Sequence, residues 1–269
     1  MPDIELQGGV ANAGAVVRVG DHVLRPSNAH TVTIHRFLRV LRADGFHGAS
    51  APIGVDADGR ERLEFIAGDV AVPPYPAWAQ TDGALASAAR LLRQFHEASG
   101  RYVVPSDATW STEMADPDAA TVDPSELVVC HNDVCLENLV YRDGEAVGLL
   151  DFDFAAPGRP LHDLATFARM NVPMDTDDDA VLLGRTPPFD PFRRLRLVAD
   201  TYGLAPDRTA FLDTLAGGIE RGGRFLQRRL DEGNEAFSAM VEATGGMAKF
   251  DRRRAWFAAN RQRFAAALG

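Results

Sequence analysis

The chain has 269 residues, of which 46% are hydrophobic and 25% charged, a composition typical of globular proteins. Its formal net charge of −10 argues against a general nucleic-acid surface, which needs basic patches that neutralise phosphates. No apolar run approaches the length of a membrane span, and the N-terminus lacks the basic and apolar regions of a signal peptide. The two cysteines, Cys130 and Cys135, make no disulfide framework, so we expect a cytoplasmic protein without nucleic-acid or membrane partners.

The first quarter of the chain alternates strand patterns with a single helix. Apolar spacing predicts strands over residues 4–6, 15–19, 22–24 and 62–66, and a helix over 31–43. The prolines of segment 73–76 then interrupt regular structure. We therefore expect a β-rich N-terminal lobe at 1–68 and a second lobe at 69–269.

The second lobe is predicted to be helical apart from short strands. Asp82 is expected to cap its first helix. Strands are predicted over 127–130, 139–142 and 146–150, with a turn at 143–144 between the last two. From 192 onward we expect several helices, broken at glycines 203, 217–218, 233 and 245–246. The order indicates a bilobal α+β fold that binds its ligand in the crevice between the lobes.

Three polar residues bracket the predicted hairpin. Asp133 and Asn138 lie on the loop before it, and Asp151 follows its second strand. Because the hairpin begins beside one residue and ends beside the other, we expect Asn138 and Asp151 to lie close together. Mg²⁺ takes hard oxygen ligands, and a separate carboxylate can receive the proton of an attacking hydroxyl. The segment therefore predicts Mg²⁺-assisted phosphoryl transfer.

The same segment resembles the catalytic machinery of a known family. Residues 131–138 have the pattern His-x-Asp-x₄-Asn, and residues 151–153 read Asp-Phe-Asp. The spacing is that of the catalytic and metal-binding loops of protein kinases. The Asp-Phe-Asp segment, and the Asp-Leu-Ala of 163–165, are similar to aminoglycoside phosphotransferases and choline kinases. The resemblance implies a protein-kinase-like fold with a small β-rich lobe and a larger helical lobe.

The resemblance also implies a role for each residue of the motif. Asp133 would be the catalytic base, and Asn138 and Asp151 would bind Mg²⁺. His131 would brace the loop against the metal-binding strand, and Asp153 would support the metal or the substrate. ATP or GTP would be the phosphate donor. The acceptor would be a hydroxyl-bearing small molecule, in the first place an aminoglycoside, with another antibiotic, a choline-like amine or a biosynthetic intermediate as open alternatives. The negative net charge is compatible with a cationic acceptor. The oligomeric state is left open.

The N-terminal lobe supplies the expected nucleotide contacts. A glycine-rich loop between two strands allows backbone N–H groups to approach phosphates. The strand after it places a cation where the family has a phosphate-binding lysine, and the segment before the lobe boundary would read the base with its backbone. The predicted contacts are Gly8, Gly9, Asn12, Gly14, Arg25, Ile66 and Ala67.

Two positions depart from the family pattern. Arg25 replaces the lysine, and His35 stands where the following helix should carry a glutamate; no carboxylate follows before Asp44. Arginine is bulkier and planar, so the replacement alters nucleotide positioning. One alternative is therefore a catalytically silent kinase-like binding protein. A separate alternative for Arg25 alone is that its side chain points into solvent beside Pro26.

Two further interpretations compete for the motif. The acids and amides of 131–138 and 151–153 would also suit a solvated turn. The Asp-x-Asp of 151–153 after a buried strand is also a feature of haloacid-dehalogenase-like phosphatases. That family favours Thr or Val where this chain has Ala155, and its motif lies near the N-terminus.

Overall fold

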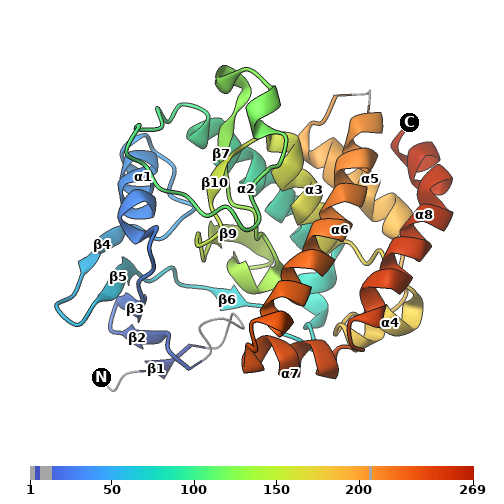
Figure 1. Ribbon diagram of the computed structural model, residues 1–269, viewed down its shortest axis with the longest axis horizontal. Helices are drawn as coiled ribbons and strands as arrows, with labels where there is room; N and C mark the ends of the chain where they lie inside the picture. The colour runs from blue at the N-terminus through green and yellow to red at the C-terminus, as the bar shows by residue number, and fades with distance from the viewer. Residues whose placement is uncertain (1–3, 7–13, 206–207) are drawn as a thin grey trace.

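The computed structural model describes residues 4–6, 14–205 and 208–269, arranged as a β-rich lobe beside a larger helical lobe (Figure 1). The first lobe contains an antiparallel sheet in the order β1-β2-β3-β5-β4. Its strands are β1 (Ile4–Glu5), β2 (Val17–Val19), β3 (His22–Pro26), β4 (Pro52–Val55) and β5 (Arg60–Glu64). Strand β3 extends beyond the predicted 22–24 and thereby includes Arg25.

Helix α1 (Thr31–Ala43) lies beside this sheet and has the bounds that the apolar spacing predicts. The side chains at the predicted face are buried: Ile34, Phe37, Leu38 and Leu41. Phe37 also packs edge-on against Phe95 of the second lobe, with ring centroids 6.1 Å apart. This aromatic contact helps to fix the position of one lobe against the other.

The second lobe holds two small sheets next to the crevice. Strands β6 (Asp69–Val70), β8 (Leu139–Arg142) and β9 (Glu145–Leu149) form one antiparallel sheet. Strands β7 (Val128–Cys130) and β10 (Ala156–Gly158) form the other. The turn between β8 and β9 has positive φ angles at Asp143 and Gly144, as a tight hairpin requires. We retain 1–68 and 69–269 as the proposed lobes.

The described part of the second lobe contains seven α-helices, besides short 3-10 helices and irregular segments. They are α2 (Asp82–Ser99), α3 (Pro160–Asn171), α4 (Asp177–Leu182), α5 (Pro191–Tyr202), α6 (Thr209–Asp231), α7 (Glu235–Ala243) and α8 (Ala248–Leu268). Figure 1 shows α6 and α8 side by side at the edge of the lobe, with α3 behind α6. In the part of the chain described, no helix combines the length and apolarity needed to cross a bilayer.

The predicted helix boundaries are partly wrong. Thr81, and not Asp82, caps α2, because its side chain accepts the backbone N–H of Ala84. Helix α6 also runs unbroken through Gly217 and Gly218. A glycine in a helix costs only about 1 kcal/mol relative to alanine, so packing against α3 outweighs it. The other glycine breaks are confirmed at 203, 233 and 245–246, where φ is positive between successive helices.

Candidate active site

The loop after β7 places Asn138 against Asp133. The Nδ2 of Asn138 donates to the backbone oxygen of Asp133 at 2.8 Å and to its carboxylate at 2.9 Å. These contacts use the amide hydrogens, so the oxygen of Asn138 is the atom that can bind a cation. The backbone N–H of Leu150 donates to the Asn138 carbonyl at 2.9 Å. The hairpin thus brings Asp151 beside Asn138, as the sequence predicts.

His131 holds this loop against the strand that leads to Asp151. Its Nε2 donates to the carbonyl of Leu150 at 2.8 Å, and the backbone N–H of Asp133 donates to its Nδ1 at 3.3 Å. Burial lowers the pKa of His131, which favours the neutral ring that these contacts require. The bracing contact expected for His131 is therefore present.

Asp163, on α3, holds the start of the catalytic loop through its carboxylate. Its fully buried carboxylate accepts the backbone N–H groups of His131 at 2.6 Å and Asn132 at 2.8 Å. It also pairs with Nε2 of His96 at 3.0 Å. Burial favours the neutral acid, but the hydrogen bonds with His96 and the loop hold the pKa of Asp163 below its usual range. The sequence pattern includes Asp163 only as part of the Asp-Leu-Ala motif at 163–165 and predicts no role for it.

Two residues of the site have backbone angles that are uncommon without glycine. Asn132 has φ 66° and Asp151 has φ 61°. Such conformations cost energy and persist only where the surroundings hold them. Here the Asn132 side chain donates to the carbonyl of Phe154 at 2.9 Å, which ties the two loops together. Together with the burial of His131, Asn132 and Asn138, this excludes the interpretation of the motif as a solvated turn.

Arg25 reaches across the crevice to the acids of the second lobe. Its Nη1 donates to Asp151 Oδ1 at 3.0 Å, and its Nη2 donates to Asp153. Its Nε forms an ion pair with Glu61 Oε1 at 2.5 Å, and Glu61 Oε2 accepts His35 Nε2 at 2.7 Å. Burial disfavours the charge of Arg25, but the three carboxylates outweigh it and raise its pKa. The alternative in which Arg25 points into solvent is therefore wrong.

Glu61 corrects the expectation of a missing ion pair. The carboxylate comes from β5 and not from α1, because Arg25 and Glu61 face each other as neighbours in the β3–β5 pairing. His35 of α1, which stands at the position of the expected glutamate, binds the far oxygen of Glu61. The cation therefore has a buried acidic partner on a different element. Sequence reasoning missed Glu61 because only the strand register identifies it.

The acids of the site repel one another. Burial, and then the charge of Asp151, raise the pKa of Asp133 well above its usual range. Burial and Asp151 also raise the pKa of Asp153 to about 6, although Arg25 opposes the shift. Clustered acids with perturbed pKa values in a crevice are typical of functional sites. Their oxygen atoms, with that of Asn138, suit Mg²⁺.

The predicted nucleotide contacts are only partly described. Gly8, Gly9 and Asn12 lie outside the described residues, whereas Gly14 precedes β2 with φ 75°. The carbonyl of Ala67 accepts Arg142 Nη2 at 2.8 Å.

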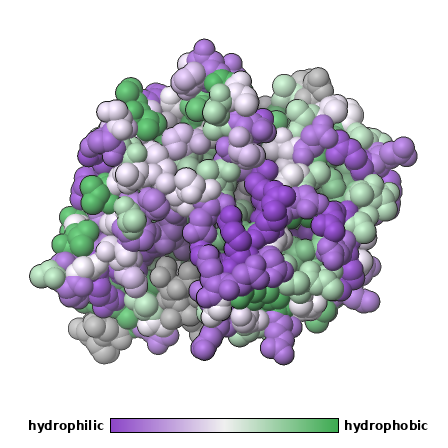
Figure 2. Space-filling model, in the orientation of Figure 1, coloured by the Kyte–Doolittle hydropathy of each residue, from purple (hydrophilic) through white to green (hydrophobic). Residues whose placement is uncertain are grey.

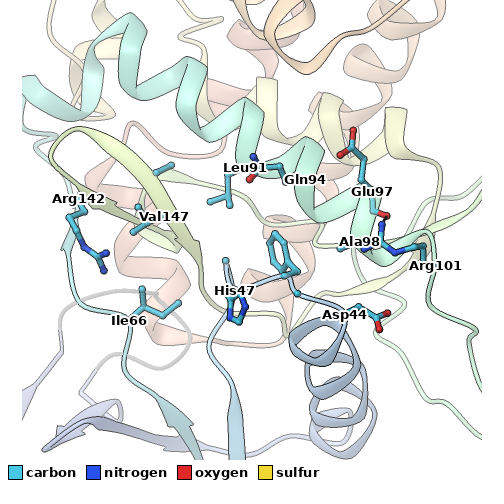
Figure 3. Close-up of a pocket in the computed structure, with 14 residues that line it drawn as sticks. Asp44, His47, Ile66, Leu91, Gln94, Glu97, Ala98, Arg101, Arg142 and Val147 are labelled. Carbon is cyan, nitrogen blue, oxygen red and sulfur yellow. Dashed lines mark hydrogen bonds between the residues drawn. The ribbon is translucent and has the colours of Figure 1, made fainter.

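The side chain of Ile66 lies at a separate cavity of about 610 Å³ behind the lobe connection. Figure 3 shows Ile66 near Arg142 at one end of this cavity, with Glu97 and Arg101 at the other. Asp133, Asp151 and Asp153 do not line this cavity, so the cavity is distinct from the candidate active site.

The fold and this site define a kinase-like phosphotransferase, and comparison with known proteins identifies the family. Residues 76–186 match the phosphotransferase enzyme family. The chain is 32% identical over 203 residues to a trifolitoxin immunity protein of Rhizobium leguminosarum bv. trifolii, covering 74% of this chain and 75% of that protein. The chain belongs to the phosphotransferase enzyme family. The prediction of an aminoglycoside phosphotransferase or choline kinase relative is confirmed.

Solved structures share the fold at low sequence identity. A choline/ethanolamine kinase family protein of Mesorhizobium loti is 20% identical, with a TM-score of 0.66 over 100% of this chain and 92% of that one. A spectinomycin phosphotransferase, solved with ADP and spectinomycin, is 14% identical, with a TM-score of 0.61 over 97% and 93%. The predicted kinase-like fold is confirmed, and the haloacid-dehalogenase interpretation is excluded.

Proposed function

We propose that the protein is a small-molecule kinase that transfers the γ-phosphate of ATP or GTP to a hydroxyl of its acceptor. The observation that carries the proposal is the contact of Asn138 with Asp133, beside an Asp151 that binds Arg25. One side of this arrangement suits a metal–triphosphate and the other suits an attacking hydroxyl. Family membership supports phosphoryl transfer as the reaction class.

In this proposal Asn138 and Asp151 hold Mg²⁺ through their side-chain oxygens. When bound, Mg²⁺ would neutralise charge on the triphosphate and on the neighbouring acids. Arg25 would then move part of its hydrogen bonding from Asp151 and Asp153 to phosphate oxygens, which guanidinium groups bind well. Glu61 would keep the guanidinium in place during that exchange, because its ion pair uses Nε and leaves both Nη groups to the ligand.

Asp133 is proposed as the catalytic base. It would accept the hydroxyl proton as the acceptor oxygen bonds to the γ-phosphorus. The bond from that phosphorus to the bridging oxygen breaks, and a nucleoside diphosphate leaves. Burial, and then repulsion from Asp151, raise the pKa of Asp133, so positive charge beside Asp151 would remove one of the two causes and favour the carboxylate. The base would therefore become active when the donor is bound.

The remaining nucleotide contacts are proposed from the family resemblance. The glycine-rich loop would cover the phosphates, and the backbone of the lobe connection would read the base. The residues are Gly8, Gly9, Asn12, Gly14, Ile66 and Ala67. The structural neighbour solved with ADP supports nucleotide binding in a fold of this type. The described cysteines, Cys130 and Cys135, are free, which agrees with the proposed cytoplasmic location.

For the acceptor, the family resemblance favours an aminoglycoside, and the spectinomycin phosphotransferase shares this fold. The immunity protein suggests a second class, a toxin, because its name refers to trifolitoxin. A second candidate function is a catalytically silent binding protein. It is favoured by one observation: Arg25 already satisfies Asp151 and Asp153 in the described structure.

The test is nucleoside diphosphate release with Mg²⁺ and ATP or GTP, across a panel of hydroxylated antibiotics, peptides and metabolites. Turnover with at least one acceptor, absent in Asp133→Asn, would support the kinase. Mg²⁺-dependent nucleotide binding without turnover on any acceptor would instead support the silent binding protein.

A further inference from the structure

Cationic side chains gather beside the catalytic loop, on the side of α6 and α8. We call this group the cation cluster: Arg169 of α3, Arg185 after α4, and Lys249 and Arg253 of α8. The cluster is tied to the catalytic loop by the last turn of α3, because Asn171 Nδ2 donates to the carbonyl of Val134 at 2.6 Å.

Arg185 connects the cluster to a second part of the loop. Its Nη2 donates to the carbonyl of Met170 at 2.7 Å, next to Arg169. Its guanidinium lies over the ring of Tyr75, 4.5 Å from the centroid, and the Tyr75 hydroxyl donates to Glu137 at 2.7 Å. Arg185 therefore lies next to α3 and, through Tyr75, beside Glu137 of the loop that carries Asp133.

Among the described residues Arg169 makes no ion pair, although the Asp133 carboxylate lies near enough to favour its charge. Within the described ranges, no carboxylate lies at ion-pair distance from its guanidinium, and its buried Nε makes no hydrogen bond. The guanidinium lies close against α6 at Gly222, where a Cβ would lie 2.9 Å from Nη1. Burial, and then the charge of Arg253, lower the pKa of Arg169 to about 10. It still carries its charge at neutral pH and disposes the site to bind an anion.

The neighbouring acids balance only part of the cluster, because Asp175 pairs with Arg253 but no described acid forms an ion pair with Arg169, Arg185 or Lys249. Asp175 is engaged by Arg253, at 2.5 and 2.7 Å, and Asp179 by Arg252, at 2.8 and 2.5 Å. Burial, and then Arg253, also lower the pKa of Lys249 to about 8, as expected where cations crowd together. Figure 2 shows hydrophilic side chains gathered around a hollow beside α6.

We propose that the phosphate acceptor carries an anionic group, a carboxylate or a phosphate, which binds at Arg169 while its hydroxyl meets Asp133. This inference rests on the proposed kinase function and differs from the cationic acceptor with which the negative net charge is compatible. Arg185 and Lys249, which form no ion pair among the described residues, attract the anion, whereas a polycationic aminoglycoside meets repulsion from them.

The test titrates sodium sulfate, and separately kanamycin as a cationic hydroxyl compound, into the protein at constant ionic strength. Mg²⁺ and a non-hydrolysable ATP analogue are present at saturation, so that Arg25 is occupied. We expect saturable sulfate binding and no saturable kanamycin binding by the wild type. Arg169→Met should weaken sulfate binding at least about tenfold, the loss of one charge-assisted contact. Arg39→Met, the same change at an exposed site on α1, should leave it unchanged.

Two results would overturn the inference without touching the kinase proposal: kanamycin binding in the absence of sulfate binding, or equal sulfate affinity in wild type and Arg169→Met. The comparison of sulfate and kanamycin binding by the wild type still tests the inference even if Arg169→Met fails to fold. Failure of the nucleotide analogue to bind would overturn the kinase proposal instead. In that case sulfate is titrated into Arg25→Gln and into the double variant that also carries Arg169→Met. Weaker sulfate binding by the double variant would support the anion site at Arg169, and equal binding would contradict it.

Discussion

Arg25 and Glu61 face each other across the β3–β5 pairing, with Arg25 Nε 2.5 Å from Glu61 Oε1. Both side chains are buried, at 7% and 4% exposure, and His35 binds the other oxygen of Glu61 at 2.7 Å. A buried ion pair with a third hydrogen-bonding group is costly to break from one side, because a charge is left without its partner. The cation of the crevice is therefore held by the N-terminal lobe even without ligand.

Glu61→Gln should destabilise the fold and weaken nucleotide binding together. Removing the charge leaves Arg25 and His35 poorly matched, at a cost of roughly 1–3 kcal/mol in the free energy of unfolding. Urea denaturation and titration with Mg²⁺–ATP would measure both effects. Glu64→Gln is the matched control, since Glu64 lies on the same strand and pairs with Arg42 at the surface. If Glu61→Gln and Glu64→Gln changed the free energy of unfolding and the ATP affinity equally, Glu61 would not position Arg25.

Arg25→Ala should weaken ATP binding far more than adenosine binding, because the proposed contact is with phosphate. A charge-assisted contact of this kind contributes roughly 1.5–3 kcal/mol, or about ten- to hundredfold in affinity. The same change should strengthen binding of Mg²⁺ alone, since Asp151 and Asp153 lose their shared cation. Arg25→Lys should retain partial activity, because a point charge cannot reach all three carboxylates. Unchanged ATP affinity in Arg25→Ala would remove Arg25 from the nucleotide site.

Asp133→Asn should lower kcat by about a hundredfold or more, the contribution expected of a general base. Nucleotide affinity should stay nearly constant, because the base acts on the acceptor. Steady-state kinetics with the best acceptor of the panel, and a separate nucleotide titration, would measure the two quantities. Asp143→Asn is the control, since Asp143 lies in the β8–β9 turn with φ 54°, which asparagine tolerates. A variant keeping more than about a tenth of wild-type kcat would contradict the assignment.

Asp163→Asn should destabilise the protein by roughly 2–4 kcal/mol, because buried N–H donors of the catalytic loop lose a charged acceptor. The pKa of Asp163 is lower in the folded state, so its contribution is complete above the unfolded pKa of about 3.9 and is lost as the pH falls through the folded pKa. Urea denaturation should show a constant gap between wild type and variant near neutral pH that shrinks only below about pH 4. Asp213→Asn, at an exposed ion pair, should change stability far less. A gap that shrinks as the pH rises would contradict the role of Asp163.

The features that could be predicted from the sequence are those set by local spacing. The apolar face of α1 follows from helical periodicity, and the approach of Asp151 to Asn138 follows from a hairpin turn at Asp143 and Gly144. These rules need only nearby residues.

The features that escaped prediction depend on contacts between distant segments. Glu61 becomes the partner of Arg25 only through the register of two strands separated by a helix. Gly217 and Gly218 stay helical because α6 packs along α3, where the Arg169 side chain lies against Gly218. Neither the register nor that helix packing is encoded in the local pattern.

The most direct test of the central claim is an isothermal titration of ATP and GTP, with and without Mg²⁺, into wild type and Asp151→Ala. The account predicts that Mg²⁺ tightens binding of at least one nucleotide to the wild type by about tenfold or more, equivalent to about 1.4 kcal/mol. The same difference should disappear in Asp151→Ala, because Asp151 supplies the proposed metal contact. Mg²⁺-independent affinity of both nucleotides for the wild type, or full Mg²⁺ dependence in Asp151→Ala, would contradict the proposed metal site.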